Sequence, residues 1–347
     1  MIDLNNIEEI KKLDPKDVFG STNMFADQCL QIWKDAHEVA FPNEYKNFQN
    51  IVLCGMGGSA YGGYVTIALF KDQLSIPLIS VNDYRLPKFV NEQTLVILSS
   101  YSGSTEEVLS CANEAVEKQA KITAITSGGA LRQFLQSRNL PSIIFSTVYN
   151  PSDQPRLGMG YMVVGVLALL SQIGLLVIEE EQFAQAVDQI KKNGEIIQQE
   201  AKTIAKNIYG TIPVIFSAEF LQGNAHVLRN QCNETAKSFA AFSPLSELNH
   251  HLMEGLKNPP NKKLTILFIT SDLYSDVLKK RTVLTQDVVA KNGVAWVAYK
   301  AKGENQLTQV LTTLSFGGYL SLFLALLYGQ DPSVIPWVDY FKEQLAK

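Results

Sequence analysis

Short runs of apolar residues alternate with longer amphipathic segments along most of the chain. In the first half, runs rich in Val, Ile, Leu and Thr have the length and composition of strands, at residues 50–54, 77–81, 94–98, 122–126 and 142–145. Segments with helical spacing lie before and between them, at residues 24–40, 60–70, 104–117 and 131–136. Because strands that alternate with helices are typical of βαβ units, we expect a parallel sheet flanked by helices.

The second half repeats this scheme. Strands are predicted at residues 213–217, 264–270 and 294–299, and helices at residues 223–237, 276–291, 307–328 and 334–345. A long polar segment at about 180–206 is expected to be a single helix that acts as a solvated connector. We therefore expect an α/β fold with two tandem units, each a mostly parallel sheet in a three-layer α/β/α sandwich. The predicted domains are residues 1–178 and 179–347.

Two stretches without a charged residue, 157–178 and 305–330, are long enough to cross a bilayer. Both contain glycine and glutamine, and neither is flanked by clusters of Lys or Arg. We therefore expect buried core helices and no membrane association. The polar segment 1–16 offers no apolar stretch for a signal peptide, so a soluble cytoplasmic protein is expected.

Composition narrows the class of protein further. Of 347 residues, 46% are hydrophobic and 18% are charged, which excludes a disordered chain and a coiled coil. The net charge is -4 and there is no block of Lys or Arg, so no nucleic-acid partner is expected. The four cysteines form no CxxC pair, which is typical of buried thiols in a reducing compartment.

The strand at residues 51–54 ends in a glycine-rich turn, residues 55–60, with the sequence GMGGSA. Glycine lets the backbone approach a ligand closely, and the helix that follows supplies free N–H groups for an anion. Three interpretations are open: a plain tight turn, a dinucleotide fingerprint of the form G-x-G-x-x-A with Asp83 on the ribose, or a site for one sugar phosphate. This turn alone does not decide among them.

A second loop favours the sugar phosphate. Residues 99–105, with the sequence SSYSGST, follow the strand at 94–98 and precede a helix with an acidic first turn. Hydroxyl groups beside free N–H groups can hold a phosphate dianion without Lys or Arg. The alternative is an elaborate N-cap made by Ser104 or Thr105, for which one hydroxyl would suffice. Both loops follow neighbouring strands, where ligands bind in open parallel sheets.

A polar segment in the otherwise apolar second half contains candidate catalytic residues. Glu234 lies near the end of a predicted helix, and His250 lies in a later loop. Buried polarity is costly unless it serves chemistry. The structural alternatives are a surface pair of Glu234 with Lys237 and a hydrogen-bonded loop histidine. Adjacent His250 and His251 have no third ligand at helical spacing, so no metal site is expected.

The two loops resemble the sugar isomerase (SIS) domain, through Gly57-Gly58-Ser59 and residues 100–105. The chain as a whole resembles the bifunctional phosphoglucose/phosphomannose isomerases. This likeness is carried by Pro155-Arg156, Asn233-Glu234-x-x-Lys237, the sequence ELNH at 247–250, and a closing segment with Asp331-Pro332 and Phe341-Lys342. It covers nearly the whole chain in family order. His251 departs from the family, in which an Asn-like neighbour is expected.

The resemblance implies interconversion of glucose 6-phosphate or mannose 6-phosphate with fructose 6-phosphate through a cis-enediol. It implies no metal and no nicotinamide cofactor. Glu234 is the implied base between C1 and C2, since a carboxylate with a raised pKa suits that task. The other implied roles are ring opening for His250 and Lys342, stabilisation of the enediolate oxygen for Arg156, and phosphate binding for Gly57, Gly58, Ser59, Ser100, Ser102 and Thr105.

The family forms homodimers with the active site at the subunit interface, so the resemblance also implies a homodimer in which the partner's His250 enters the site. We expect the apolar helices at 157–172 and 307–328 to supply the buried interface. Three other classes of function stay open, and a phosphohexomutase or epimerase is the hardest of them to exclude by pattern. A non-catalytic SIS regulatory protein that binds sugar phosphates would keep both loops but would not need Glu234, His250 and Lys342 together. A dehydrogenase would bind NAD.

Overall fold

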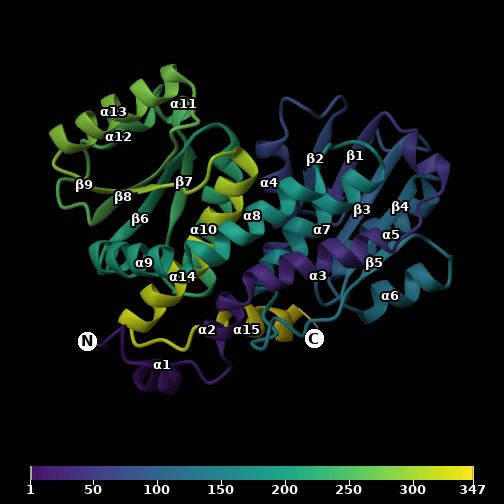
Figure 1. Cartoon of the computed structure of the whole chain (residues 1–347), viewed down its shortest axis with the longest axis horizontal. Helices are drawn as coiled ribbons and strands as arrows, with labels where there is room; N and C mark the ends of the chain where they lie inside the picture. The colour runs from purple at the N-terminus through teal and green to yellow at the C-terminus, as the bar shows by residue number, and fades with distance from the viewer. Residues whose placement is uncertain (1, 346) are drawn as a thin grey trace.

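The computed structural model describes residues 2–345 and 347, and it contains two parallel sheets (Figure 1). The first has the strand order β2-β1-β3-β4-β5, and the second has the order β7-β6-β8-β9. The strands are β1 (Asn50–Cys54), β2 (Leu78–Val81), β3 (Thr94–Ser100), β4 (Lys121–Thr126), β5 (Ser142–Ile144), β6 (Ile212–Ser217), β7 (Ala241–Pro244), β8 (Leu264–Thr270) and β9 (Ala295–Lys300). All pair in parallel, which confirms the expected α/β class.

The helices follow the sequence expectation closely in most places. They are α1 (Ile7–Leu13), α2 (Val18–Asn23), α3 (Phe25–His37), α4 (Tyr61–Leu69), α5 (Glu106–Glu117), α6 (Gly129–Gln136), α7 (Met159–Gln172), α8 (Glu180–Lys192), α9 (Gly194–Ile208), α10 (Gln222–Glu234), α11 (Leu245–Leu248), α12 (Leu252–Gly255), α13 (Asp276–Lys291), α14 (Gln306–Leu327) and α15 (Pro336–Leu345). The short elements β7, α1, α2, α11 and α12 were not predicted.

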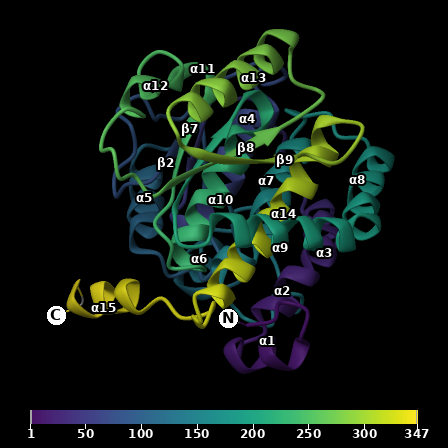
Figure 2. The ribbon, with the colours of Figure 1, turned by 90° about the vertical axis from the view of Figure 1, so that its left-hand side faces the viewer.

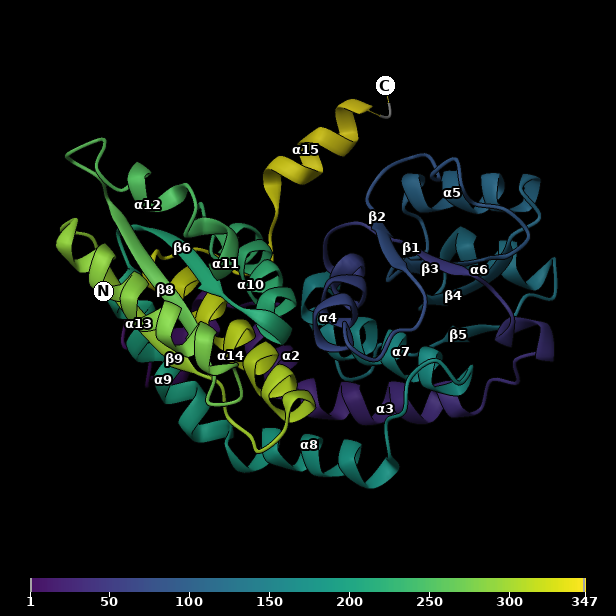
Figure 3. The ribbon, with the colours of Figure 1, turned by 90° about the horizontal axis from the view of Figure 1, so that it is seen from above.

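A layer of helices joins the two sheets. Seen from above, α4, α7, α10 and α14 lie between the sheet of β1–β5 and the sheet of β6–β9 (Figure 3). Helix α10 contacts α4 on one side and α14 on the other, and α7 contacts α3 and α4. The main hydrophobic core extends through this layer from one sheet to the other. The elements that carry the two halves of the site therefore share one packed interior.

The polar segment after residue 178 is not the single solvated connector that we expected. It forms two helices, α8 and α9, with a break at Asn193. Each helix has a buried apolar stripe, with Phe183 and Ile190 on α8 and Ile197 and Ile204 on α9 among its members. Both pack against α14. The charges that dominate this segment occupy only the outer faces, which is why its composition suggested full solvation.

The two long apolar helices are core helices, as predicted. Helix α14 meets the length and composition of a membrane span, but it is fully buried within the chain. Helix α7 is almost as completely buried. Our expectation that these two helices supply a dimer interface is therefore wrong, because other elements of the same chain already cover them. An interface between chains needs another surface.

The chain ends in a helix that stands apart from the rest. Helix α15 projects away from the body of the molecule (Figure 2). None of its described side chains is buried, and Trp337 has an exposed fraction of 82%. This is unusual for a helix with large apolar residues, which normally bury them.

Candidate active site

The glycine-rich turn and the serine-rich loop meet at the switch point of the first sheet. In the order β2-β1-β3-β4-β5, β2 is added on one side of β1 and β3 on the other, so the strand order reverses between β1 and β3, and ligands bind at the carboxyl ends of the strands at such a point. Residues 55–60 follow β1, and residues 101–105 follow β3. We call the six residues expected to bind phosphate here the first cradle: Gly57, Gly58, Ser59, Ser100, Ser102 and Thr105.

Geometry favours glycine at two positions of the first cradle. Gly57 has φ +52°, in the left-handed region, and a Cβ there would point into open space. Gly58 lies against the backbone of Pro155 and Arg156, and a Cβ on it would come within 2.9 Å of the Arg156 nitrogen. Glycine at position 58 therefore lets the turn touch the segment that carries Arg156.

Hydrogen bonds hold the hydroxyls of the first cradle in place. Ser59 Oγ accepts a bond from the Tyr101 N–H at 2.9 Å, which ties the two loops together. Ser100 Oγ lies 2.9 Å from Thr105 Oγ1 and also accepts from the Gly103 N–H at 3.1 Å. Thr105 is the N-cap residue of α5, yet its side chain makes no capping bond to the described residues. The hydroxyls thus do more than terminate a helix.

The dinucleotide interpretation finds little support around Asp83. This residue is exposed, and its carboxylate accepts a bond from the neighbouring Tyr84 N–H at 2.6 Å. An acidic residue that holds a ribose should instead point free toward the glycine-rich turn. The geometry at the switch point favours a compact anion held by both loops.

Glu234 is the last residue of α10 and forms the side of the site opposite the first cradle. Its Oε2 atom is buried and has no hydrogen-bond partner among the described residues. Burial raises the pKa of this carboxyl above its ordinary value, while the positive charges of Arg156, Lys342 and Lys237 act in the opposite direction. The structural alternative, a surface pair with Lys237, is therefore not what the structure shows. A buried carboxyl with a raised pKa is suited to taking and returning a proton.

Arg156 is almost completely buried beside this carboxyl, with an exposed fraction of 2%. Its Nη2 donates to the carbonyls of Pro332 and Ser333, at 2.8 Å each, and its Nε donates to Thr235 Oγ1 at 3.1 Å. Nη1 donates to Gln154 Oε1 at 3.0 Å. A guanidinium has five N–H donors, so one Nη1 hydrogen is left for a ligand by these bonds. Arg156 therefore anchors the segment before α15 as well as facing Glu234.

Lys237 holds the same segment from a second position. Its Nζ donates to the Asp331 carbonyl at 2.5 Å and to the Thr235 carbonyl at 3.1 Å. Burial and the nearby Arg156 lower the pKa of Lys237 to about 8. Together, Arg156 and Lys237 bind three consecutive carbonyls and so fix the base of α15. Lys342 lies on this helix, and its charge reaches Glu234.

His250 does not join the site within one chain. It lies exposed just after α11, where its backbone N–H donates to the Glu247 carbonyl at 3.0 Å. Its neighbour His251 pairs at the surface with Glu247, Nε2 to Oε1 at 3.3 Å. Of the predicted catalytic residues, the chain thus brings Glu234 and Arg156 together, with Lys342 close enough to affect Glu234 electrostatically, and leaves His250 apart.

One cavity joins the first cradle to the candidate base. It has a volume of about 450 Å³ and is lined by residues from both halves of the chain: Gly57, Arg229, Asn230, Asn233, Glu234, Phe239, Ala240, Ala241 and Phe242. Arg229 and Asn230 were missed by the sequence analysis. A guanidinium five positions before Glu234 on one helix is a signal that could have drawn attention to Arg229. Its Nε is buried without a partner among the described residues.

The cysteines lie outside this chemistry. All four are free and buried, as predicted. Among residues 2–345 and 347, no cluster of His, Cys, Asp and Glu has the composition of a metal site. The groups at hand are therefore hydroxyls, N–H donors, cations and one buried carboxyl.

Comparison with known proteins gives a consistent result. The family model of the bacterial phospho-glucose isomerase C-terminal SIS domain matches residues 197–345. The bifunctional phosphoglucose/phosphomannose isomerase of Aquifex aeolicus is 32% identical, and the match covers 98% of this chain and 99% of that protein. The protein of the same name from Caldicellulosiruptor bescii is 31% identical, with 95% and 99% covered. Among solved structures, tagatose-6-phosphate ketose/aldose isomerase from Escherichia coli matches with a TM-score of 0.66 at 17% identity, over 94% of this chain and 95% of that one.

Proposed function

Since this chain belongs to the bifunctional phosphoglucose/phosphomannose isomerase family, we propose that it interconverts glucose 6-phosphate and mannose 6-phosphate with fructose 6-phosphate. The observation that carries this proposal is the cavity shared by Gly57 of the first cradle and Glu234. A phosphate held at one side of that cavity presents the sugar chain to a buried carboxyl at the other.

Glu234 acts as the base in this proposal. It removes the proton from C2 of the open-chain aldose. The electron pair of that C–H bond forms the C1–C2 double bond, while the C1=O1 π pair moves to O1, which takes a proton, and a cis-enediol results. The same carboxyl then returns its proton to C1 as the O2–H proton leaves and the C2=O2 bond forms, which gives the ketose. No electron leaves the substrate, so we propose no cofactor. Because the intermediate is planar at C2, proton return can serve substrates that differ only at that carbon.

Arg156 stabilises the oxygen that gains charge as the enediol forms. One of its Nη1 hydrogens remains after its four protein bonds, and the guanidinium keeps its charge at any working pH. Lys342 and His250 open the sugar ring by moving protons at the ring oxygen and O1. The first cradle holds the phosphate through N–H groups and hydroxyls, which fixes C1 and C2 near the base.

We further propose that the working form is a homodimer in the cytoplasm, with the partner's His250 completing each site. Two observations support a second chain. His250 is exposed and does not line the cavity that contains Glu234. Helix α15 presents Trp337, Phe341 and Leu345 to solvent, with exposed fractions of 82%, 63% and 55%. Apolar surface of this kind marks a contact with another protein surface.

The activity is tested with purified protein and fructose 6-phosphate in EDTA, followed by chromatographic separation of the aldose phosphates. We expect both glucose 6-phosphate and mannose 6-phosphate to form. Their absence would refute the proposed function. Tight binding of NAD, seen as a thermal shift, would instead support a dehydrogenase.

The shared site is tested by mixing two inactive variants, Glu234→Gln and His250→Ala, after mild dissociation. If the partner's His250 completes each site, a mixed dimer has one intact site, and roughly a quarter of wild-type activity should return. Mixtures that stay inactive, or a fully active monomer in sedimentation, would contradict the interface arrangement. In the control, each of the two variants is dissociated and reassociated alone, and each should stay inactive.

A further inference from the structure

The second sheet repeats the framework that builds the first cradle. Its order β7-β6-β8-β9 places a switch point between β6 and β8, equivalent to the one between β1 and β3. Phe216 pairs with Phe268 in the second sheet, and Cys54 pairs with Leu98 in the first. Counting from these pairs gives a residue-by-residue correspondence between the loops at the two switch points.

Gly57 lies three positions after Cys54 in the first half, and Glu219 lies three positions after Phe216 in the second. Both residues begin a 3-10 turn, Gly57–Ala60 and Glu219–Leu221, that leads into a helix. Both have a left-handed backbone, with φ +52° for Gly57 and +44° for Glu219. This conformation is disfavoured for a residue with a Cβ. A glutamate is thus held in a backbone geometry that suits glycine.

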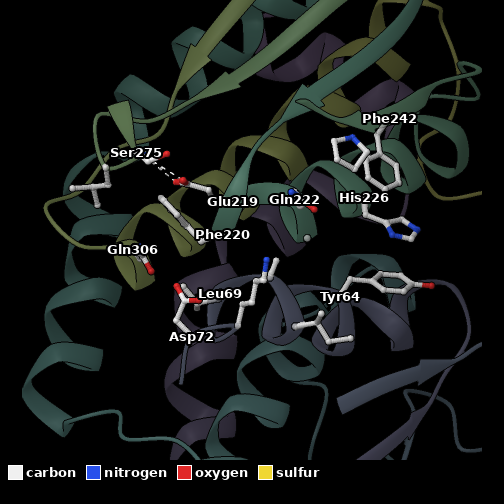
Figure 4. Close-up of a pocket in the computed structure, with 16 residues that line it drawn as sticks. Tyr64, Leu69, Asp72, Glu219, Phe220, Gln222, His226, Phe242, Ser275 and Gln306 are labelled. Carbon is white, nitrogen blue, oxygen red and sulfur yellow. Dashed lines mark hydrogen bonds between the residues drawn. The ribbon is translucent and has the colours of Figure 1, made fainter. Parts of the chain in front are cut away.

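On the other loop, Thr105 lies seven positions after Leu98 in the first half, and Ser275 lies seven positions after Phe268 in the second. Each is the N-cap residue of its helix, α5 and α13, and neither side chain makes a capping bond to the described residues. In the second half, the Ser275 N–H donates to both carboxylate oxygens of Glu219, at 3.3 and 3.2 Å (Figure 4). The Glu219 side chain therefore lies between the two loops, where the first half keeps open space beside Gly57.

The neighbouring positions agree with this arrangement. Gly58 and Ser59 are replaced by Phe220 and Leu221, whose side chains are buried in the core. Ser102 is replaced by Asp272, which pairs with Lys300 at 2.5 Å. We call residues 219–221 and 271–275 the second cradle. It has lost both glycines and the hydroxyls of Ser59 and Ser102, and it has gained two carboxylates.

We propose that Glu219 closes the second cradle by placing its own carboxylate where a ligand phosphate would bind, so that each chain holds the sugar phosphate at one switch point only. The carboxylate satisfies the N–H at the start of α13, as an anion would. Its charge also repels a phosphate dianion. This inference rests on the proposed function, because it takes the first cradle to be a phosphate site.

A hollow remains beside the second cradle. A cavity of about 820 Å³ lies between α4 and the start of α10, and Glu219 and Ser275 are part of its wall (Figure 4). Space for a ligand is therefore present, and the Glu219 side chain determines that a phosphate is not accepted there. Removing that side chain should open an anion site without rebuilding the fold.

Calorimetric titration with inorganic phosphate at constant ionic strength tests this proposal. The wild-type chain should bind one phosphate. In a parent variant with Ser102→Ala and Thr105→Ala, binding should weaken by about tenfold or more. Adding Glu219→Gly to that parent should restore a phosphate site, and phosphate-soaked crystals should show the anion at the Ser275 N–H. Glu219→Gln keeps an oxygen acceptor for Ser275 and is the matched control, which should restore nothing.

Two results would overturn the inference: a second phosphate at Ser275 in the wild-type chain, or a folded Glu219→Gly variant whose phosphate affinity equals that of its parent. Should Glu219→Gly fail to fold, Glu219→Ala decides by the same criterion, since it removes the carboxylate and keeps the Cβ. A wild-type chain that binds no phosphate would refute the proposed function instead, so the two failures are distinguishable.

Discussion

The first cradle and the proton-transfer residues differ in how complete they are within one chain. In the first cradle, Ser59, Ser100 and Thr105 already have hydrogen-bond partners in the loops themselves. In contrast, Glu234 Oε2 has no partner among the described residues, and His250 is exposed. The proposed phosphate-binding half is therefore preorganised within one chain, whereas the proposed proton-transfer half is not, and in the proposed homodimer the partner's His250 would complete it.

The largest effect is expected for Glu234→Gln, which tests the incomplete half directly. The amide cannot accept the C2 proton, so kcat should fall by roughly 10²–10⁴-fold. Phosphate affinity should not change, because the first cradle is intact. Steady-state kinetics and calorimetry measure the two effects separately. Near-normal turnover would remove Glu234 from the mechanism, and Glu254→Gln is the matched control for loss of an acidic side chain.

Arg156→Lys should weaken the attachment of the segment before α15 to the rest of the site. Lysine lacks the planar fork that binds the carbonyls of Pro332 and Ser333, so the free energy of unfolding should fall by about 2–4 kcal/mol. Turnover should fall as well, because these bonds fix the base of α15. Denaturant unfolding and kinetics measure the two effects. Arg138→Lys, at an exposed arginine, is the control, and equal stability of Arg156→Lys and wild type would contradict the anchoring role.

Ser102→Ala tests the preorganised half with little structural disturbance, since this side chain is exposed. Loss of one hydrogen bond to a charged phosphate costs about 1.5–3 kcal/mol, so KM should rise by roughly tenfold or more while kcat changes little. An exposed serine of the same half, Ser137, gives the control variant Ser137→Ala. A fall in kcat with constant KM would show that the division into phosphate-binding and proton-transfer halves is wrong.

The smallest effect is a pH dependence set by Glu234. Its pKa is raised in the folded protein, so kcat/KM should rise with pH on an acid limb that lies above the ordinary glutamate pKa of about 4.3. For stability the sign is opposite. A raised folded-state pKa contributes stability at low pH that is lost as pH rises through it, with about 1.4 kcal/mol for each unit of the raise.

Glu234→Gln removes this titration, so its stability relative to wild type should increase with pH. Thermal unfolding of both proteins from pH 4 to pH 8 gives the comparison, under roughly constant ionic strength. A stability difference that stays constant across this range would mean that the carboxyl is not protonated more readily in the folded state.

Much of the fold was predictable because its strands are short apolar runs with clear ends. The strand β7 was missed, since residues 241–244 are few, only half-buried and end in proline. The buried stripes of α8 and α9 were hidden by charges on their outer faces. In both cases the tertiary contacts, rather than local composition, decided the environment.

The site was predictable to the extent that its residues lie in local motifs. Two loop sequences predict the first cradle, and Glu234 was predicted from its place near a helix end together with the resemblance carried by Asn233-Glu234-x-x-Lys237. Arg229 belongs to no local motif, and its place in the cavity depends on how α10 packs. The anchoring bonds of Arg156 join it to Pro332 and Ser333, which are distant in sequence, so no spacing rule could indicate them.

The burial of α14 has a consequence for how the polypeptide is made. This long, fully buried apolar helix is translated after α2, α8, α9 and α10, and all four pack against it. Until residue 327 has emerged from the ribosome, the apolar faces of those earlier helices are exposed to solvent. The nascent chain therefore cannot complete its hydrophobic core. Premature termination before α14 should therefore yield aggregates that chaperones hold, whereas loss of α15 alone should leave a foldable polypeptide.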